Sequence, residues 1–103
     1  MYARLATYKY SGDARDLARR AEEGMLPIFR EQPGFRSYSI SEDDGEILSM
    51  SVWDRAEQAD AANAAAADWV KANMADDLEL QQVRTAELLL STALNVSSAA
   101  APV

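Results

Sequence analysis

Residues 33–57 read PGFRSYSISEDDGEILSMSVWDRAE, and this stretch decides the fold. Its first part alternates polar and apolar side chains, as a half-buried strand does, and its second part does the same up to Trp53. Between them, Asp43-Asp44-Gly45 supplies residues that tolerate a positive φ, which tight hairpin turns require. The stretch therefore predicts a β-hairpin, with strands over Phe35 to Ser41 and Glu46 to Trp53.

A helix is expected directly after this hairpin. Asp54 and Glu57 have the spacing of a capping box, with aspartate in place of serine or threonine. The residues that follow are rich in alanine, which is the best helix former and lets a helix lie close to a sheet. Trp69, Val70 and Met74 continue the apolar side. We therefore predict a helix that is capped at Asp54 and packs on the sheet.

A strand and a helix precede the hairpin. Residues 2 to 10 are rich in aromatic residues and alternate in character, which predicts a strand. Asp13 is a suitable N-cap, and the apolar residues after it recur at helical spacing. Because Pro27 removes one backbone hydrogen bond, a kink or a two-part helix is expected there. Pro33-Gly34 ends the helix.

The last strand is expected within Leu78 to Thr92, centred on Val83, Ala86 and the run Leu88 to Leu90. Such a continuous apolar run suggests burial on both faces of the strand. The predicted order is β-α-β-β-α-β, which is the α+β, ferredoxin-like arrangement with a four-stranded antiparallel sheet. Both helices then cover one face, and a homodimer that packs sheet against sheet is the hypothesis for the other.

The length, net charge and cysteine content of the chain bear on its domain organisation and disfavour several classes of function. A chain of 103 residues predicts one domain, which we place at residues 1–93, followed by a tail at residues 94–103. Packing of the tail on a partner subunit is a hypothesis. The net charge of −7 disfavours binding to nucleic acid or to an anionic membrane. The absence of cysteine excludes disulfides and thiolate chemistry. Without a signal pattern or a membrane-length apolar run, we expect a cytoplasmic protein.

Several short motifs carry a resemblance to a known family. They are Leu26-Pro27, Gln32-Pro33-Gly34-Phe35, the hairpin turn Asp43-Asp44-Gly45, and Val52-Trp53-Asp54 with Glu57 and Ala59 just beyond. With these motifs, residues 2 to 92 resemble the antibiotic biosynthesis monooxygenase family of the dimeric α/β-barrel superfamily. The resemblance implies an obligate dimer with facing sheets and a small pocket between sheet and helices in each subunit. It also implies cofactor-independent oxidation of quinol or polyketide-like aromatics, with no metal or flavin.

The chain departs from this family at its catalytic position. Enzymes of the family often use a histidine in the second helix, about nine residues after the tryptophan that ends the strand. Ala62 stands at that position, with Asn63 beside it, and the chain has no histidine. The haem-degrading relatives need an asparagine in the first strand and a histidine, which disfavours that activity here. A non-catalytic small-molecule-binding or stress-related dimer is therefore the alternative to a monooxygenase. A dimerisation module for another protein is a third hypothesis, disfavoured because few residues lie outside the predicted domain.

Aromatic and amide side chains are the first candidates for a binding site. Trp53 could stack on an aromatic ligand or simply fill the core, and Trp69 could serve the core or a dimer contact. The phenols of Tyr8, Tyr10 and Tyr38 could hydrogen-bond a quinol, although tyrosine is common in strands. Asn63 can orient a substrate oxygen but cannot act as a base at neutral pH.

Charged residues give the remaining candidates. Arg4, Arg36 and Arg84 lie inside predicted strands, where a covered arginine needs a partner such as Glu87 or one of the strand serines. Such an arginine could hold an anionic substrate group, or form a structural ion pair. The pairs Asp43-Asp44 and Asp76-Asp77 fit ordinary turns. The predicted substrate-binding residues are Trp53, Asn63, Arg36, Tyr38 and Tyr8. We assign no catalytic residue, metal or cofactor.

Overall fold

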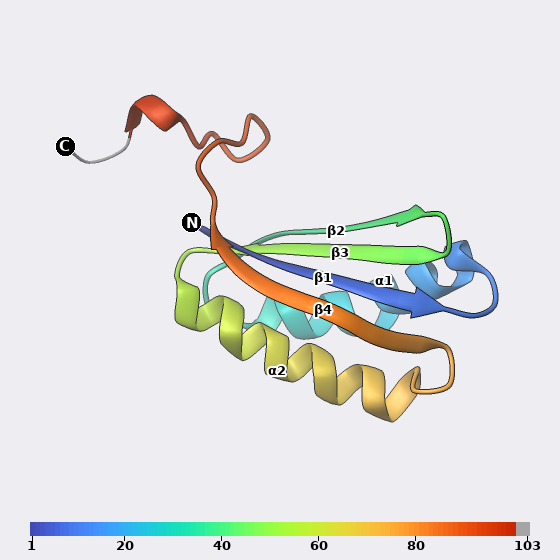
Figure 1. The fold of residues 1–103 in the computed structure, drawn as a ribbon. Coiled ribbons are helices and arrows are strands. Elements are labelled where there is room, and N and C mark those ends of the chain that lie inside the picture. The colour runs from blue at the N-terminus through green and yellow to red at the C-terminus, as the bar shows by residue number, and fades with distance from the viewer. Residues whose placement is uncertain (101–103) are drawn as a thin grey trace.

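The computed structural model describes residues 1–100. Along the chain lie β1 (Tyr2–Tyr10), α1 (Ala14–Glu31), β2 (Phe35–Asp43), β3 (Glu46–Trp53), α2 (Ala56–Asn73), β4 (Leu78–Glu87) and a 3-10 turn, η1 (Ser98–Ala100). The strands form one antiparallel sheet in the order β2-β3-β1-β4. Both helices lie on the same side of this sheet (Figure 1). The predicted ferredoxin-like α+β fold is therefore confirmed.

The hairpin between β2 and β3 closes through the expected turn. Asp44 and Gly45 have φ values of 47° and 85°, and Asp43 lies opposite Glu46. Two residues at positive φ match the right-handed twist of the flanking strands. At the other end of β2, Phe35 lies opposite Trp53 and Ser37 opposite Val52, so Arg36 is an extra residue in a bulge.

The first helix is capped as expected but is not divided. The Asp13 carboxylate accepts a hydrogen bond from the Arg15 backbone N–H at 2.9 Å. Of the two expectations at Pro27, a kink or a two-part helix, the two-part helix was wrong, because α1 runs without a break through that residue. Pro27 is exposed, so water can satisfy the Glu23 carbonyl that loses its partner. The helix also buries a continuous apolar stripe, formed by Leu17, Ala21, Met25 and Phe29.

The second helix uses a different cap from the predicted one. Its N-cap is Arg55, whose backbone N–H donates to the Gln58 side-chain oxygen at 3.0 Å. Asp54 does not cap the helix, because its carboxylate accepts a hydrogen bond from Arg36 Nε at 2.6 Å. The predicted close packing of the alanine-rich helix is confirmed: Ala59, Ala62 and Ala66 are buried.

The two helices touch where Trp69 of α2 lies over Gly24 of α1. A Cβ atom at Gly24 would lie only 2.8 Å from Cε2 and Nε1 of Trp69. The indole can therefore rest on α1 only because residue 24 has no side chain. No helix of residues 1–100 is long and apolar enough to cross a membrane.

The last strand is shorter than predicted. It ends at Glu87, so the expectation that Leu88 to Leu90 form its centre was wrong. The Leu88 backbone N–H bonds to the Met1 carbonyl at 2.9 Å, and the chain then leaves the sheet. Burial on both faces of β4 was also wrong for the single chain, because β4 is an edge strand with mostly exposed residues.

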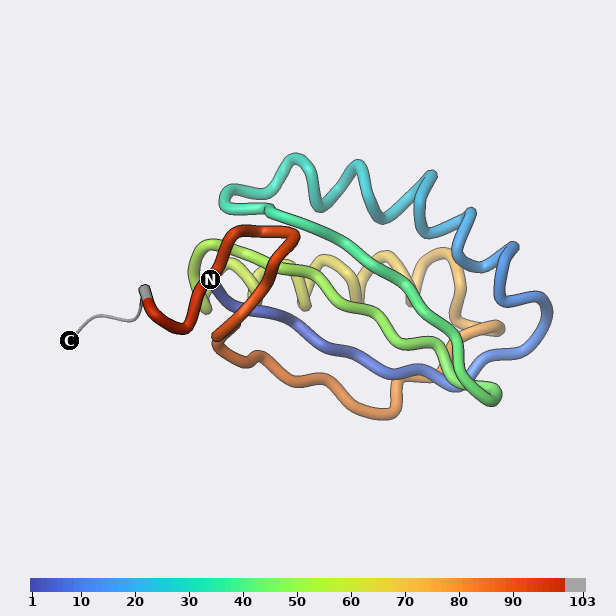
Figure 2. Tube along the Cα trace, turned by 90° about the horizontal axis from the view of Figure 1, so that it is seen from above, coloured from blue at the N-terminus to red at the C-terminus, as the bar shows by residue number. Residues whose placement is uncertain are grey.

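Beyond β4 the tail rises on the side of the sheet that carries no helix (Figure 1). Seen from above, it passes over the end of the sheet where β1 begins (Figure 2). A bridge joins Ser91 to Val96 within it. Leu89 and Leu90 are 66% and 65% exposed. The predicted tail spans residues 94–103, of which 101–103 lie outside the described residues.

Candidate functional site

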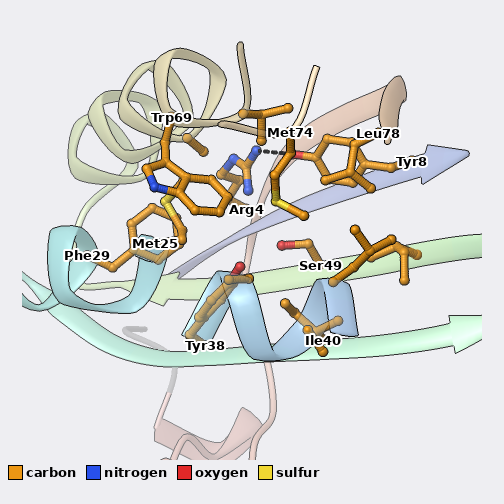
Figure 3. Close-up of a pocket in the computed structure, with 16 residues that line it drawn as sticks. Arg4, Tyr8, Met25, Phe29, Tyr38, Ile40, Ser49, Trp69, Met74 and Leu78 are labelled. Atoms are coloured by element: carbon orange, nitrogen blue, oxygen red, sulfur yellow. Dashed lines mark hydrogen bonds between the residues drawn. The ribbon is translucent and has the colours of Figure 1, made fainter. Parts of the chain in front are cut away.

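A small cavity lies between the sheet and the two helices. Its free volume is about 30 Å³. This space can hold a water molecule or a small polar group but no aromatic ring. Apolar side chains from α1, α2 and the sheet form most of its wall, and the polar exceptions are Arg4, Tyr8, Tyr38 and Ser49. The hydroxyl ends of Tyr38 and Ser49 point toward the space beside Arg4 (Figure 3).

Arg4 is the central polar residue of this cavity. Alternation along β1 places it on the same face as Tyr8, beneath the helices, and it is only 2% exposed. Its Nε donates to the Asn63 side-chain oxygen at 2.9 Å, and its Nη2 donates to the Tyr8 hydroxyl at 3.2 Å. No carboxylate within residues 1–100 forms an ion pair with Arg4. The site therefore contains a buried positive charge held by neutral partners.

Tyr38 faces the same space from β2, and its phenol keeps its proton at neutral pH, so it can donate a hydrogen bond. Burial raises the pKa of its phenol to about 12. A hydrogen bond with Ser49 and the charge of Arg4 lower this pKa in part, while Tyr8 raises it. The cavity lining contains no acidic side chain, lysine or histidine. The site can therefore donate hydrogen bonds, but it lacks a group that would accept a proton at neutral pH.

The raised pKa of Tyr38 predicts a loss of stability in alkaline solution. The folded protein holds this proton more tightly than the unfolded chain does. The resulting contribution to the free energy of unfolding is complete below pH 10 and declines as the pH rises toward about 12. We expect this decline to be about 1 to 2 kcal/mol, because the ring is only partly buried. Tyr38→Phe should lack it. Urea unfolding of both proteins at about pH 9 and about pH 11 measures the difference, and equal declines would contradict the assignment to Tyr38.

The predicted site residues lie in three different places. Tyr8 and Tyr38 line the cavity, and Asn63 binds Arg4 from α2. Trp53 is fully buried in the core, where its Nε1 donates to the Ser51 hydroxyl at 2.9 Å. Arg36 lies at the surface, with its side chain 48% exposed and paired with Asp54. The structure thus brings Tyr8, Tyr38 and Asn63 together around Arg4, and leaves Trp53 and Arg36 outside the lining.

Sequence reasoning missed three of the residues that shape the site. Arg4 was considered only as one of three strand arginines, although its alternation with Tyr8 signalled a shared face. Ser49 was noted only as a strand serine, and Trp69 only as a residue for the core or a dimer contact. Both line the cavity, with Trp69 reaching it from α2. Arg84 belongs to the helix-free side, where it lies opposite Leu5.

The acidic pairs do not contribute to this site. Asp43 and Asp44 lie at the hairpin, and Asp77 forms an ion pair with Arg20 at 3.0 Å near the end of α2. Among residues 1–100, no group of three or more acidic side chains is arranged to hold a metal ion.

The comparisons with known proteins identify the fold. No protein-family model and no curated protein matches the sequence. Among solved structures, MupZ from Pseudomonas fluorescens matches with a TM-score of 0.66 and 8% identity, over 82% of this chain and 69% of its own. A candidate antibiotic biosynthesis monooxygenase from Chloroflexus aurantiacus J-10-fl matches with a TM-score of 0.65 and 16% identity, over 91% and 98%. Rv0793 from Mycobacterium tuberculosis matches with a TM-score of 0.64 and 21% identity, over 88% and 97%.

These matches cover most of each of the three solved structures, so the likeness extends over the whole domain. At 8 to 21% identity it concerns the backbone arrangement, and it carries no information about substrate or activity. It agrees with the resemblance carried by the turn, hairpin and helix motifs. The chain therefore has an antibiotic biosynthesis monooxygenase-like fold.

Proposed function

We propose that the chain binds a small aromatic or quinol-type molecule at the Arg4 cavity and oxidises it as a cofactor-independent monooxygenase. The observation that carries this proposal is the set of hydrogen-bond donors at one apolar cavity, namely Arg4, Tyr8, Tyr38 and Ser49. Apolar walls suit an aromatic ring, and a few fixed donors suit the oxygen atoms on its rim. The likeness of fold to a candidate antibiotic biosynthesis monooxygenase supports the same proposal.

The proposed reaction takes its electrons from the substrate. A phenol that becomes a quinone gives up four electrons: two leave with two protons as the hydroxyl hydrogen and one ring hydrogen, and two go to the oxygen atom that is inserted. One atom of O2 becomes a new carbonyl oxygen on the ring, and the other leaves with the two hydrogens as water. The role of the protein would be to hold the ring away from bulk water and to donate hydrogen bonds to its oxygens.

A ligand would enter between α1 and β2. On the outer side of this gap lies a groove of about 250 Å³, lined by Glu22 and Leu26 together with Ala18, Tyr38 and Ile40. The last three also line the inner cavity, so they separate the two spaces. Because the inner cavity is too small for a ring, Tyr38 or Ile40 must move when a ring enters.

Oxygen consumption tests the proposal. With 1,8-dihydroxyanthrone as the probe, we expect the protein to raise oxygen uptake above the uncatalysed rate and to form the anthraquinone with one labelled oxygen atom from 18O2. The exposed variant Arg30→Met is the control for nonspecific effects of surface charge. Uptake equal to the protein-free rate would refute the oxidation.

A second candidate function is favoured by the lack of a proton acceptor in the lining. A protein of this fold that only binds its small molecule, as a carrier or in a stress response, needs hydrogen-bond donors but no base. Binding of the anthrone without oxygen uptake would support this alternative. Failure to bind would remove both candidates.

We further propose that the chain forms a homodimer through the helix-free face of its sheet. Leu5 and Leu48 are each 40% exposed there, beside a hollow of about 390 Å³. The net charge of the chain is −7, yet the middle of this face bears no acidic side chain. The segment after β4 rises on the same side (Figure 1) and contains the exposed Leu89 and Leu90, so the tail is proposed to pack on the partner subunit.

A further inference from the structure

We infer that the ligand of the cavity carries an anionic oxygen and that the Arg4 guanidinium binds it. This inference rests on the proposed function only in placing a ligand in the cavity, and it holds whether or not the ligand is oxidised. Its substance is the chemical class of the ligand: an aromatic carboxylate or phenolate rather than a neutral phenol.

The first argument is the charge balance around Arg4. A buried ion without a partner of opposite charge is unfavourable by several kcal/mol, even after the protein relaxes around it. Within residues 1–100, the hydrogen-bond partners of Arg4 are only an amide and a phenol. Asp60, one helical turn before Asn63, is exposed and accepts instead from the Thr85 hydroxyl at 3.2 Å. Residues 1–100 therefore leave the Arg4 charge uncompensated, and an anion in the cavity would supply the missing charge.

The second argument concerns the direction in which Arg4 can still donate. A guanidinium has five N–H groups, and hydrogen bonds occupy Nε and Nη2. Nη1 forms no hydrogen bond with residues 1–100, yet this part of the chain contains no fully buried side-chain nitrogen or oxygen without a partner. Nη1 therefore keeps some accessible surface. Because Arg4 is almost fully buried and lines the cavity, we infer that this unused donor faces the space where a ligand would lie.

The third argument is the chemistry of the remaining lining. Tyr38 and Ser49 point hydroxyl groups toward the same space, and both can donate to an anion (Figure 3). No carboxylate lines the inner cavity, and the carboxylate of Glu22 lines only the outer groove. The volume of about 30 Å³ suits a charged oxygen group. The ring would then extend toward the outer groove of about 250 Å³, through the space that opens when Tyr38 or Ile40 moves.

Benzoate and benzamide test this inference, because they share size and shape and differ in charge. We expect the wild-type protein to bind benzoate about tenfold more tightly than benzamide, as measured by titration calorimetry. In Arg4→Met the two affinities should agree within about twofold. Arg30→Met removes an exposed positive charge and should keep the wild-type ratio.

Two further measurements separate ligand binding by Arg4 from misfolding and from a purely structural role. Arg4→Met removes a buried charge, which favours folding, but it also removes the hydrogen bonds to Asn63 and Tyr8, so urea unfolding is used to verify that the variant is folded. Arg4→Lys retains a cation and should retain a preference for benzoate, which a purely structural role would not explain. Equal affinities for the two probes in the wild type, or no binding of either, would overturn the inference.

The source of the anionic oxygen is resolved by 4-nitrophenol, whose absorbance reports its ionisation. If bound 4-nitrophenol ionises at a lower pH than free 4-nitrophenol, the site recognises a phenolate. If the site is selective for benzoate alone, it recognises a carboxylate. Both results support the anion site. Anthrone oxidation without any preference for benzoate would refute the anion site and leave the proposed oxidation standing. A preference for benzoate without oxygen uptake would support the anion site and refute the proposed oxidation.

Discussion

Replacing Trp53 by alanine will lower the free energy of unfolding by about 4 kcal/mol. Its indole is fully buried, and its ring centroid lies 5.4 Å from those of both Phe29 and Phe35. Both ring pairs are edge-to-face, an arrangement that adds to the stabilisation from burial. The substitution also leaves the buried Ser51 hydroxyl without the hydrogen bond from Nε1. Cavity, aromatic contacts and hydrogen bond are thus lost together.

Trp69→Ala is the matched control, because it removes the same side chain from a partly exposed position. We expect this variant to lose less than half as much stability as Trp53→Ala. Urea unfolding followed by far-ultraviolet circular dichroism, at one protein concentration, gives both values without depending on tryptophan fluorescence. Equal losses would mean that Trp53 is not the centre of the core.

Comparison of sequence and structure shows which features are locally determined. The hairpin was predictable because Asp44 and Gly45 adopt positive φ from their own conformational preferences. The Asp13 cap was predictable for the same kind of reason. The cap at Asp54 was not, because Arg36 comes within 2.6 Å of its carboxylate only after β2 and β3 have paired. A tertiary contact there overrides a local pattern.

The end of β4 shows a different limit of sequence reasoning. An apolar run such as Leu88 to Leu90 signals burial but not the surface that provides it. In the single chain these residues lie beyond the sheet, with Leu89 and Leu90 about two-thirds exposed. Interpreting this run as part of a strand put the predicted centre of the strand several residues too far toward the C-terminus. As an exposed apolar segment, the run indicates a surface that contacts another chain.

The candidate site depended on register, which the sequence leaves open. Which face of the sheet carries Arg4 was not determined from the sequence, and the structure puts Arg4 and Tyr8 together at the cavity. Arg36 was expected at the site, but it occupies the bulge between Phe35 and Ser37. A one-residue irregularity of this kind sends a side chain to another side of the strand. The residue type was informative, and the choice among strand arginines required the fold.

Leu48→Asp will convert the proposed dimer to a monomer. Leu48 lies in the middle of the helix-free face, opposite Thr7 of β1 and Ser41 of β2. In a two-fold interface the substitution buries two carboxylates near each other, and each would be a buried charge without a partner. We expect the dimer dissociation constant to rise by about a hundredfold or more. The fold of the subunit should persist, because Leu48 is already 40% exposed in the single chain.

Leu80→Asp separates an effect on this face from a general effect of an added charge. Leu80 is 50% exposed and lies opposite Tyr8, so it belongs to the helix-covered side of the sheet. Sedimentation velocity over a range of concentrations should therefore find Leu80→Asp dimeric like the wild type, and Leu48→Asp monomeric. A monomeric wild type at micromolar concentration would contradict the dimer itself. Dissociation of both variants would show that the interface lies elsewhere, because Leu48 lies on the helix-free face of the sheet and Leu80 lies on the helix-covered side.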